Sequence, residues 1–243
     1  MQLFRLSILI SSVLIASVPL LAQQQDFPSD DVIERRSSEE PLNEGDYPAT
    51  VETLGDQADG AVSDPYFAEN WSDGQVTLDG GDEYDNVELR YDVYRNRLLI
   101  RGKDGKATPL DPEKVRSFTI GPPRLANLAR FQRAKYLIGF DAVPDEQFVQ
   151  VIYQSESALL AVHRKDVASA SQESSSQLGA TVTDYYYLSP EGEVSAFEPN
   201  REAVLDLFSD RREAVQTFIQ ETMLDFDNVS DLARLVAFYD QKP

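Results

Sequence analysis

Trp71–Leu110, with the sequence WSDGQVTLDGGDEYDNVELRYDVYRNRLLIRGKDGKATPL, contains the clearest β-strand pattern of the chain. At its centre Val87, Leu89, Tyr91 and Val93 stand at every second position, with mostly polar residues between them. A period of two indicates a β-strand that buries one face, because successive side chains of a strand point to opposite sides.

Turn residues divide this stretch into four short runs. Asp79-Gly80-Gly81 ends the first run, since glycine takes the positive φ angles that turns need. Asp104-Gly105 is a hairpin signal, and Arg95-Asn96 is a short link. The sequence therefore predicts an antiparallel meander with strands at Gln75–Leu78 and Val87–Tyr94, from Leu98–Ile100 onward, and at Ala107–Leu110.

The chain continues with more runs of β-branched, aliphatic and aromatic residues between turn signals. Asp111–Lys114 fits a turn or one turn of helix. The pattern predicts strands at Arg116–Ile120, Glu146–Tyr153, Ala158–Val162, Thr181–Leu188 and Glu193–Phe197. Between them, Arg124–Tyr136 fits short strands and a helical turn equally well, so residues 122–136 receive no assignment. Val167–Ala180 is rich in Ser, Gln and Ala and predicts a flexible excursion.

The apolar period changes from two to the helical 3.6 after residue 199. Asn200 is placed to cap a first helix, Ser209 or Asp210 to start a second, and Asn228 or Ser230 to start a third. Their apolar stripes are Val204, Leu207 and Phe208; Val215, Phe218, Ile219 and Met223; and Leu232, Leu235, Val236 and Tyr239. The prediction is an α+β fold, in which an antiparallel β-meander sheet (a curved sheet, a sandwich or a partial barrel) is followed by a short C-terminal three-helix segment.

The N-terminal part predicts export. Arg5 precedes an apolar run from Leu6 to Leu21, which is typical of a secretory signal peptide over residues 1–22. The alternative is a single membrane anchor, but the run is short for a span and no stop-transfer charges follow it. We therefore expect no stable membrane span after cleavage, and a periplasmic or extracellular location. The chain has no cysteine, which for an exported protein of this length favours a bacterial source.

Composition divides the remainder into three parts. Residues 23–63 are acidic and poor in large apolar residues, so we expect a disordered leader that cannot offset its ordering entropy. Residues 64–199 form the predicted antiparallel β domain, and residues 200–243 the helices packed on it.

Charge limits the classes of partner. The net charge of −20 repels phosphate backbones and anionic lipid surfaces, so we expect no nucleic-acid partner. One segment, Lys114–Phe140, contains no acidic residue but six basic ones: Lys114, Arg116, Arg124, Arg130, Arg133 and Lys135. These bases either neutralise the acidic turns of the chain, which is the favoured interpretation, or form a contact site for an anion or polyanion.

Several pieces of the chain follow one another in a recognisable order: Gly74-x-Val76, Tyr84-x-x-Val87-x-Leu89-Arg90-Tyr91-Asp92-Val93-Tyr94, Phe118-Thr119-Ile120-Gly121, Phe148–Ile152 with Leu159-Leu160, Tyr186-Tyr187-Leu188, and Asp231-Leu232 with Leu235-Val236 and Phe238-Tyr239-Asp240. In this order they resemble a family of uncharacterised exported proteins of Bacteroidota. The chain departs from the family pattern at Asp92, Phe238 and Asp240. The resemblance implies an exported bacterial protein with a β-meander and a three-helix tail, and it carries no active-site residues.

Few residues qualify as a catalytic or binding site. His163, the single histidine, has a strand-end context beside two cations, and we expect it on the surface. The carboxylates of Asp79–Asp85 could attract calcium, although their spacing differs from that of an EF-hand loop. Tyr185-Tyr186-Tyr187 together with Tyr91 and Tyr94 could stack on a carbohydrate, but strand aromatics more often form core pairs. We assign no catalytic residue, cofactor or metal ligand.

The functional prediction is therefore broad. The favoured hypothesis is an exported soluble protein, more a non-enzymatic binding or structural module of the bacterial envelope than an enzyme, with a protein or carbohydrate of the envelope as partner. The alternative is a carboxylate-dependent hydrolase of envelope carbohydrate, because 42 acidic residues offer many carboxylate pairs. A calcium-dependent adhesion domain is a third hypothesis.

Overall fold

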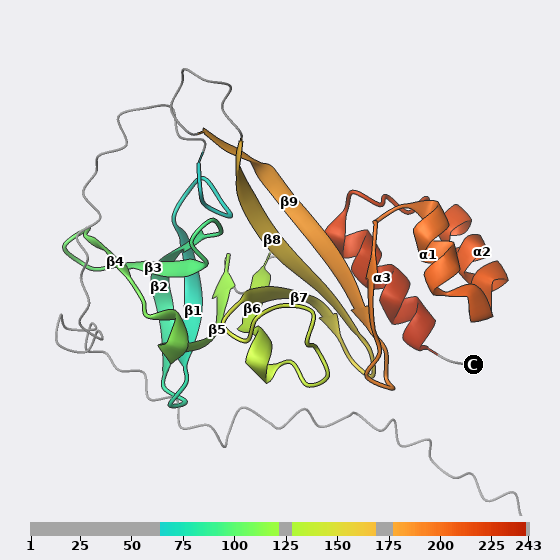
Figure 1. The fold of residues 1–243 in the computed structure, drawn as a ribbon, viewed down its shortest axis with the longest axis horizontal. Coiled ribbons are helices and arrows are strands. Elements are labelled where there is room, and N and C mark those ends of the chain that lie inside the picture. The colour runs from blue at the N-terminus through green and yellow to red at the C-terminus, as the bar shows by residue number, and fades with distance from the viewer. Residues whose placement is uncertain (1–63, 122–127, 169–176, 242–243) are drawn as a thin grey trace, which may run out of the picture. The chain divides into compact units, whose positions relative to one another are not determined.

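The computed structural model describes residues 64–121, 128–168 and 177–241, in which ten strands form one antiparallel sheet and three α-helices follow (Figure 1). The strands are β1 (Ser72–Leu78), β2 (Glu83–Asp92), β3 (Arg97–Arg101), β4 (Ala107–Pro109), β5 (Val115–Ile120), β6 (Ala129–Arg133), β7 (Phe148–Gln154), β8 (Ala158–Ala168), β9 (Gln177–Leu188) and β10 (Val194–Phe197). The helices are η1 (Pro112–Lys114), η2 (Ala134–Tyr136), α1 (Arg201–Leu207), η3 (Ser209–Arg211), α2 (Arg212–Thr222) and α3 (Val229–Asp240). The predicted α+β fold is confirmed. The predicted signal peptide and acidic leader lie outside the described residues.

The sheet consists of two meanders, β1 to β4 and β5 to β10, which are joined by the pairing of β1 with β5. Its strand order is β10-β9-β8-β7-β6-β5-β1-β2-β3-β4, so the chain runs outward from β1 to β4 and then returns to pair β5 with β1. The four-strand meander predicted from Trp71–Leu110 is confirmed by β1 to β4. The sheet does not close, because β4 and β10 remain its two edges.

Aromatic contacts show that the sheet is strongly curved. Tyr91 on β2 and Phe148 on β7 have three strands between them in the sheet order. In a flat sheet the two strands would be about 19 Å apart, at about 4.8 Å per step. The two ring centroids are instead 5.9 Å apart. The strands therefore bend around a shared interior, where both residues are buried with Phe118 and Phe131. Of the three architectures left open by the sequence, the structure has the curved sheet.

Asn96, in the link between β2 and β3, holds this curvature. Its backbone has a φ of 51°, a left-handed conformation that asparagine tolerates better than most residues. Its side-chain oxygen accepts hydrogen bonds from the Tyr91 hydroxyl at 2.8 Å and from the Phe148 amide at 3.1 Å. Its side-chain nitrogen donates to the Glu146 carbonyl at 2.9 Å. One side chain thus ties the first meander to the start of β7.

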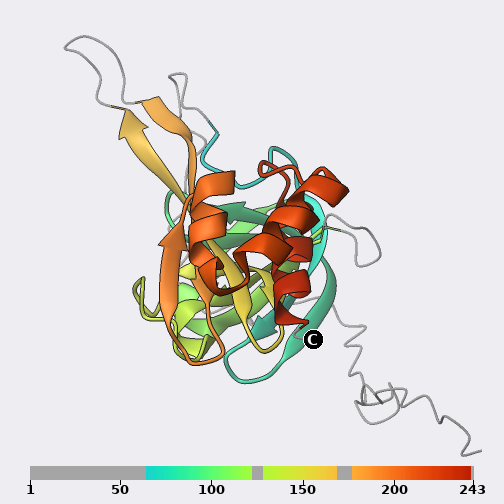
Figure 2. The ribbon, with the colours of Figure 1, turned by 90° about the vertical axis from the view of Figure 1, so that its right-hand side faces the viewer.

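The three α-helices pack together against β7, β8 and β9 (Figures 1 and 2). Asn200 caps α1 by accepting from the Ala203 amide, and Asn228 caps α3 by accepting from the Ser230 amide, both at 2.9 Å. Helices this short are marginal alone in water, so the shared core stabilises them. That core contains Leu159 and Tyr187 of the sheet together with Val204, Leu205, Phe208, Val215, Ile219, Leu224, Leu232, Leu235 and Val236.

Three expectations about local structure need correction or completion. Strands β8 and β9 extend to Ala168 and back to Gln177, so the ends of the predicted excursion Val167–Ala180 are paired with each other. Backbone pairing does not require an apolar pattern, which is why composition missed it; residues 169–176 lie outside the described residues. The unassigned segment contains both a strand, β6, and a helical turn, η2. Met223 is 87% exposed, because α2 ends there with a left-handed residue before the stripe is complete.

Asp240 at the end of α3 fastens the helices to the β7–β8 turn. Its carboxylate accepts hydrogen bonds from the Ser157 hydroxyl at 2.8 Å, the Ser157 amide at 3.3 Å and the Tyr153 hydroxyl at 3.0 Å. Ser157 is buried, so removing the carboxylate takes the acceptor away from its backbone amide.

We predict that Asp240→Ala lowers the free energy of unfolding by about 1–3 kcal/mol, the cost of leaving buried donors unpaired. Urea unfolding followed by circular dichroism measures this difference. The control is Asp206→Ala, which removes only an exposed ion pair with Arg212 and should cost less than about 1 kcal/mol. Equal costs for the two variants would contradict a fastening role for Asp240.

Candidate functional site

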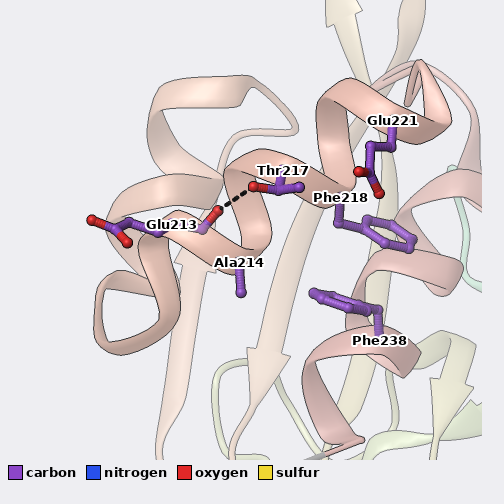
Figure 3. A pocket seen from close by; sticks show the side chains of 6 residues that line it. All are labelled: Glu213, Ala214, Thr217, Phe218, Glu221 and Phe238. Carbon is purple, nitrogen blue, oxygen red and sulfur yellow. Dashed lines mark hydrogen bonds between the residues drawn. The ribbon is translucent and has the colours of Figure 1, made fainter.

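An open groove lies between α2 and α3 on the surface of the helical segment (Figure 3). Its volume is about 330 Å³, and Glu213, Ala214, Thr217, Phe218, Glu221 and Phe238 line it. Phe218 of α2 and Phe238 of α3 stack across the helix pair, with ring centroids 4.4 Å apart and an interplanar angle of 15°. The groove therefore presents an aromatic surface that the helices leave half-buried.

The helical period explains why these two phenylalanines remain partly open. In α2, Val215 and Ile219 point to the sheet, and Phe218 lies at the border of this buried stripe. In α3, Leu235 and Val236 are buried, while Phe238 lies at the border that faces α2. The sequence pattern predicts Phe218 in a core stripe and indicates no site at Phe238. Two border aromatics on successive helices are the signal that could have found the groove.

Glutamates give the groove its charge. Glu213 and Glu221 both line it and are exposed. The backbone carbonyl of Glu213 accepts a hydrogen bond from the Thr217 hydroxyl at 2.9 Å, so this hydroxyl is directed to its own helix (Figure 3). The guanidinium of Arg211 lies 5.5 Å from the Phe238 ring and donates to the Tyr239 carbonyl at 2.7 Å. The lining of the groove itself thus combines apolar rings with two negative charges.

His163 is buried inside the curved sheet, and the expectation of a surface residue is wrong. It lies within β8 directly after Ala158–Val162, a run in which every residue is apolar and buried, and that uninterrupted apolar run is the overlooked signal. Its Nε2 is 2.7 Å from the Gln150 side-chain oxygen and its Nδ1 is 3.0 Å from the Thr183 hydroxyl. The Phe67 ring packs on it at 5.0 Å. Both ring nitrogens are therefore occupied by structural hydrogen bonds.

Burial lowers the pKa of His163 to about 4. The unfolded chain, with the ordinary pKa of 6.5, binds this proton more readily than the folded chain. The contribution of the neutral imidazole to the free energy of unfolding is therefore fully present above pH 6.5, and it is lost as the pH falls toward 4.

We predict that wild-type protein loses about 2–3 kcal/mol more stability than His163→Gln between pH 7 and pH 4.5, at about 1.4 kcal/mol per pH unit. Urea unfolding of both proteins at the two pH values measures this difference. Both proteins have the same carboxylates, so the effect of carboxylate titration on stability cancels in the comparison. If wild type and His163→Gln differ in free energy of unfolding by the same amount at both pH values, His163 does not titrate in this range.

The basic residues of Lys114–Phe140 are partly neutralised, as the favoured interpretation predicts. Asp79 of the β1–β2 turn pairs with Arg133 at 3.1 Å and with Lys135 at 3.3 Å. Lys114, Arg116 and Arg130 are exposed, and they form no ion pair in the part of the chain that the structure describes. Arg124 lies outside the described residues.

The acidic turn and the tyrosines do not form the sites considered for them. Within residues 64–121, 128–168 and 177–241, no group of three acidic or histidine side chains is placed to hold a metal ion, in the Asp79–Asp85 turn or elsewhere. Tyr186 packs on the opposite face of β9 from Tyr185 and Tyr187, and Tyr91 is in the core. These rings thus do not form one platform, since strand alternation sends neighbours to opposite faces.

The comparisons with known proteins add no assignment. No family model, no curated protein and no solved structure matches the chain. The resemblance to exported Bacteroidota proteins therefore stays a prediction. No helix in the described part of the chain is long and apolar enough to cross a membrane.

Proposed function

We propose that the protein is an exported binding module of the bacterial envelope, which holds a partner without changing it chemically. The observation that carries this proposal is the α2–α3 groove with its stacked pair, Phe218 and Phe238. Aromatic rings left partly open on a surface supply a large binding contribution when a partner covers them.

The partner that fits this groove is a protein segment with an apolar side chain and a neighbouring lysine or arginine. The apolar side chain would cover the rings, and its cationic neighbour would lie near Glu213 or Glu221. A volume of about 330 Å³ is at the lower end for ligand pockets, which suits one or two side chains of a peptide. Phe218 and Phe238 also cover one face of each other, which removes those faces from stacking on a sugar.

The test compares capture from a Bacteroidota envelope extract by three forms of the protein. The groove variant is Glu213→Lys with Glu221→Lys, and the matched control is Glu202→Lys with Glu193→Lys. All four glutamates are exposed, and each pair includes one residue from the first turn of a helix. We expect a partner that wild type and the control retain and the groove variant loses.

The same partner, once purified, should bind the groove variant at least about tenfold more weakly, as expected when two complementary charges are reversed. Capture of the same set of proteins by all three forms would refute the groove as the binding surface. Release of sugars from the extract by wild type would refute a non-enzymatic role and favour the hydrolase.

A further inference from the structure

One aromatic ring, Tyr136 at the end of η2, gathers three cationic groups. The Arg116 guanidinium lies 4.8 Å from the ring centroid, the Lys135 ammonium 4.7 Å and the Arg133 guanidinium 5.4 Å. These four residues and Asp79 are called the Tyr136 cluster. It lies apart from the α2–α3 groove in the chain and shares no residue with it.

Strand pairing assembles this cluster. Ser117 of β5 pairs with Gln132 of β6, so the preceding Arg116 and the following Arg133 meet at the end of the same strand pair. Helix η2 follows β6 directly and places Lys135 and Tyr136 beside them. Asp79 reaches the cluster from the β1–β2 turn, where its amide donates to the Lys114 carbonyl at 2.8 Å.

The cluster has an excess of positive charge. Asp79 pairs with Arg133 and Lys135 through its two oxygens, and it is the one carboxylate that forms an ion pair with any of the three cations in the described ranges. Three cations and one carboxylate leave two positive charges in excess around one ring. The net charge of −20 repels anions at long range, so these two uncompensated charges act on an anion only at short range.

Two of the cations are accessible and one is structural. Arg133 is 3% exposed, and it donates to the Pro112 carbonyl and to Asp79, both at 3.1 Å. Its Nε is buried and has no hydrogen-bond partner among the described residues. Arg116 and Lys135 are exposed and hold their charges against the same ring. A ligand would therefore meet Arg116 and Lys135, with the buried charge of Arg133 behind them.

We propose that the Tyr136 cluster binds an anionic group, a phosphate, sulfate or carboxylate carried by a small molecule or polymer. Arg116 and Lys135 donate charge-assisted hydrogen bonds to its oxygens, and the Tyr136 ring keeps the two cations side by side. Asp79 opposes binding, because it competes for Lys135 and repels the anion.

Isothermal titration with sodium pyrophosphate at low ionic strength tests this site in the complete protein. Arg116→Ala should weaken binding about tenfold or more, since it removes a charged hydrogen-bond donor. Asp79→Asn should strengthen binding severalfold. The matched control is Arg130→Ala, an exposed arginine on β6 whose side chain points to the opposite face from Arg133, and it should change binding less than about twofold.

A thermal melt of each variant shows whether its fold is intact. If Asp79→Asn is unfolded, Lys135→Ala replaces it, and this variant should weaken anion binding as much as Arg116→Ala does. Titrations with heparin and with oligogalacturonate then distinguish a sulfate from a carboxylate source. The proposal is overturned if wild type binds none of the three probes. It is equally overturned if Arg130→Ala and Arg116→Ala weaken binding to the same extent, because only general charge attraction then acts.

Discussion

Removal of residues 200–243 should convert the protein into an aggregating fragment. The helices cover Leu159 of β8 and Tyr187 of β9, and Phe208 packs edge-on against Tyr187 with ring centroids 5.1 Å apart. Without the helices these residues become an exposed apolar face on strands, which promotes association between chains. Size-exclusion chromatography with light scattering of a chain that ends at residue 199 measures the outcome.

A milder change provides the control for this deletion. Truncation after Gln241 leaves α3 and its contacts in place, so this protein should keep the molar mass in solution and the melting temperature of the full chain. If the chain ending at residue 199 instead stayed monomeric and melted cooperatively, the helices would be a separate module and their apolar surface a partner site.

Tyr91→Ala should be the most destabilising single substitution considered for the sheet. The Tyr91 side chain is 1% exposed, and its ring contacts Phe118 at 5.3 Å, Phe131 at 5.1 Å and Phe148 at 5.9 Å. Truncation of a buried aromatic side chain to alanine costs about 3–5 kcal/mol, because it removes buried apolar area and leaves a cavity. Urea unfolding followed by tryptophan fluorescence and circular dichroism measures the loss.

Two companion variants separate the contributions of Tyr91. Tyr91→Phe retains the ring and loses the hydroxyl that donates to Asn96, so it should cost about 0.5–1.5 kcal/mol. Tyr94→Ala removes a neighbouring side chain that is 43% exposed and should cost less than about 1 kcal/mol. Similar losses for Tyr91→Ala and Tyr94→Ala would show that the interior of the curved sheet does not depend on Tyr91.

The local elements follow from patterns between residues that are close in the sequence. Alternation around Tyr91 specifies a strand with one buried face, and Asp104-Gly105 specifies the hairpin turn, where Gly105 has a φ of 78°. Asn200 and Asn228 specify two helix starts through hydrogen bonds to amides two or three residues away. All of these features depend on neighbours in the chain, so a local pattern is sufficient to predict them.

Which buried faces meet depends instead on contacts between distant parts of the chain. An alternating strand must bury one face, but the alternation does not say whether another sheet, a helix or the same curved sheet covers it. Where the curvature brings Tyr91 to Phe148, the Asn96 side chain accepts a hydrogen bond from the Phe148 amide, 52 residues away in the chain. The burial of His163 has a local signal in the apolar run before it, but its ring contact with Phe67 joins residues that are far apart in the chain.

The two proposed sites show this division most clearly. The surplus of basic residues in Lys114–Phe140 is visible in the sequence, but Asp79 lies 54 residues from Arg133, and only the fold decides which cations it neutralises. Phe218 and Phe238 are visible as apolar residues of two helices, but their stacking and the groove beside them depend on how α2 and α3 pack. Sequence patterns thus specify the character of each side chain, whereas long-range packing, which follows from the burial of apolar faces against distant partners, decides which side chains act together.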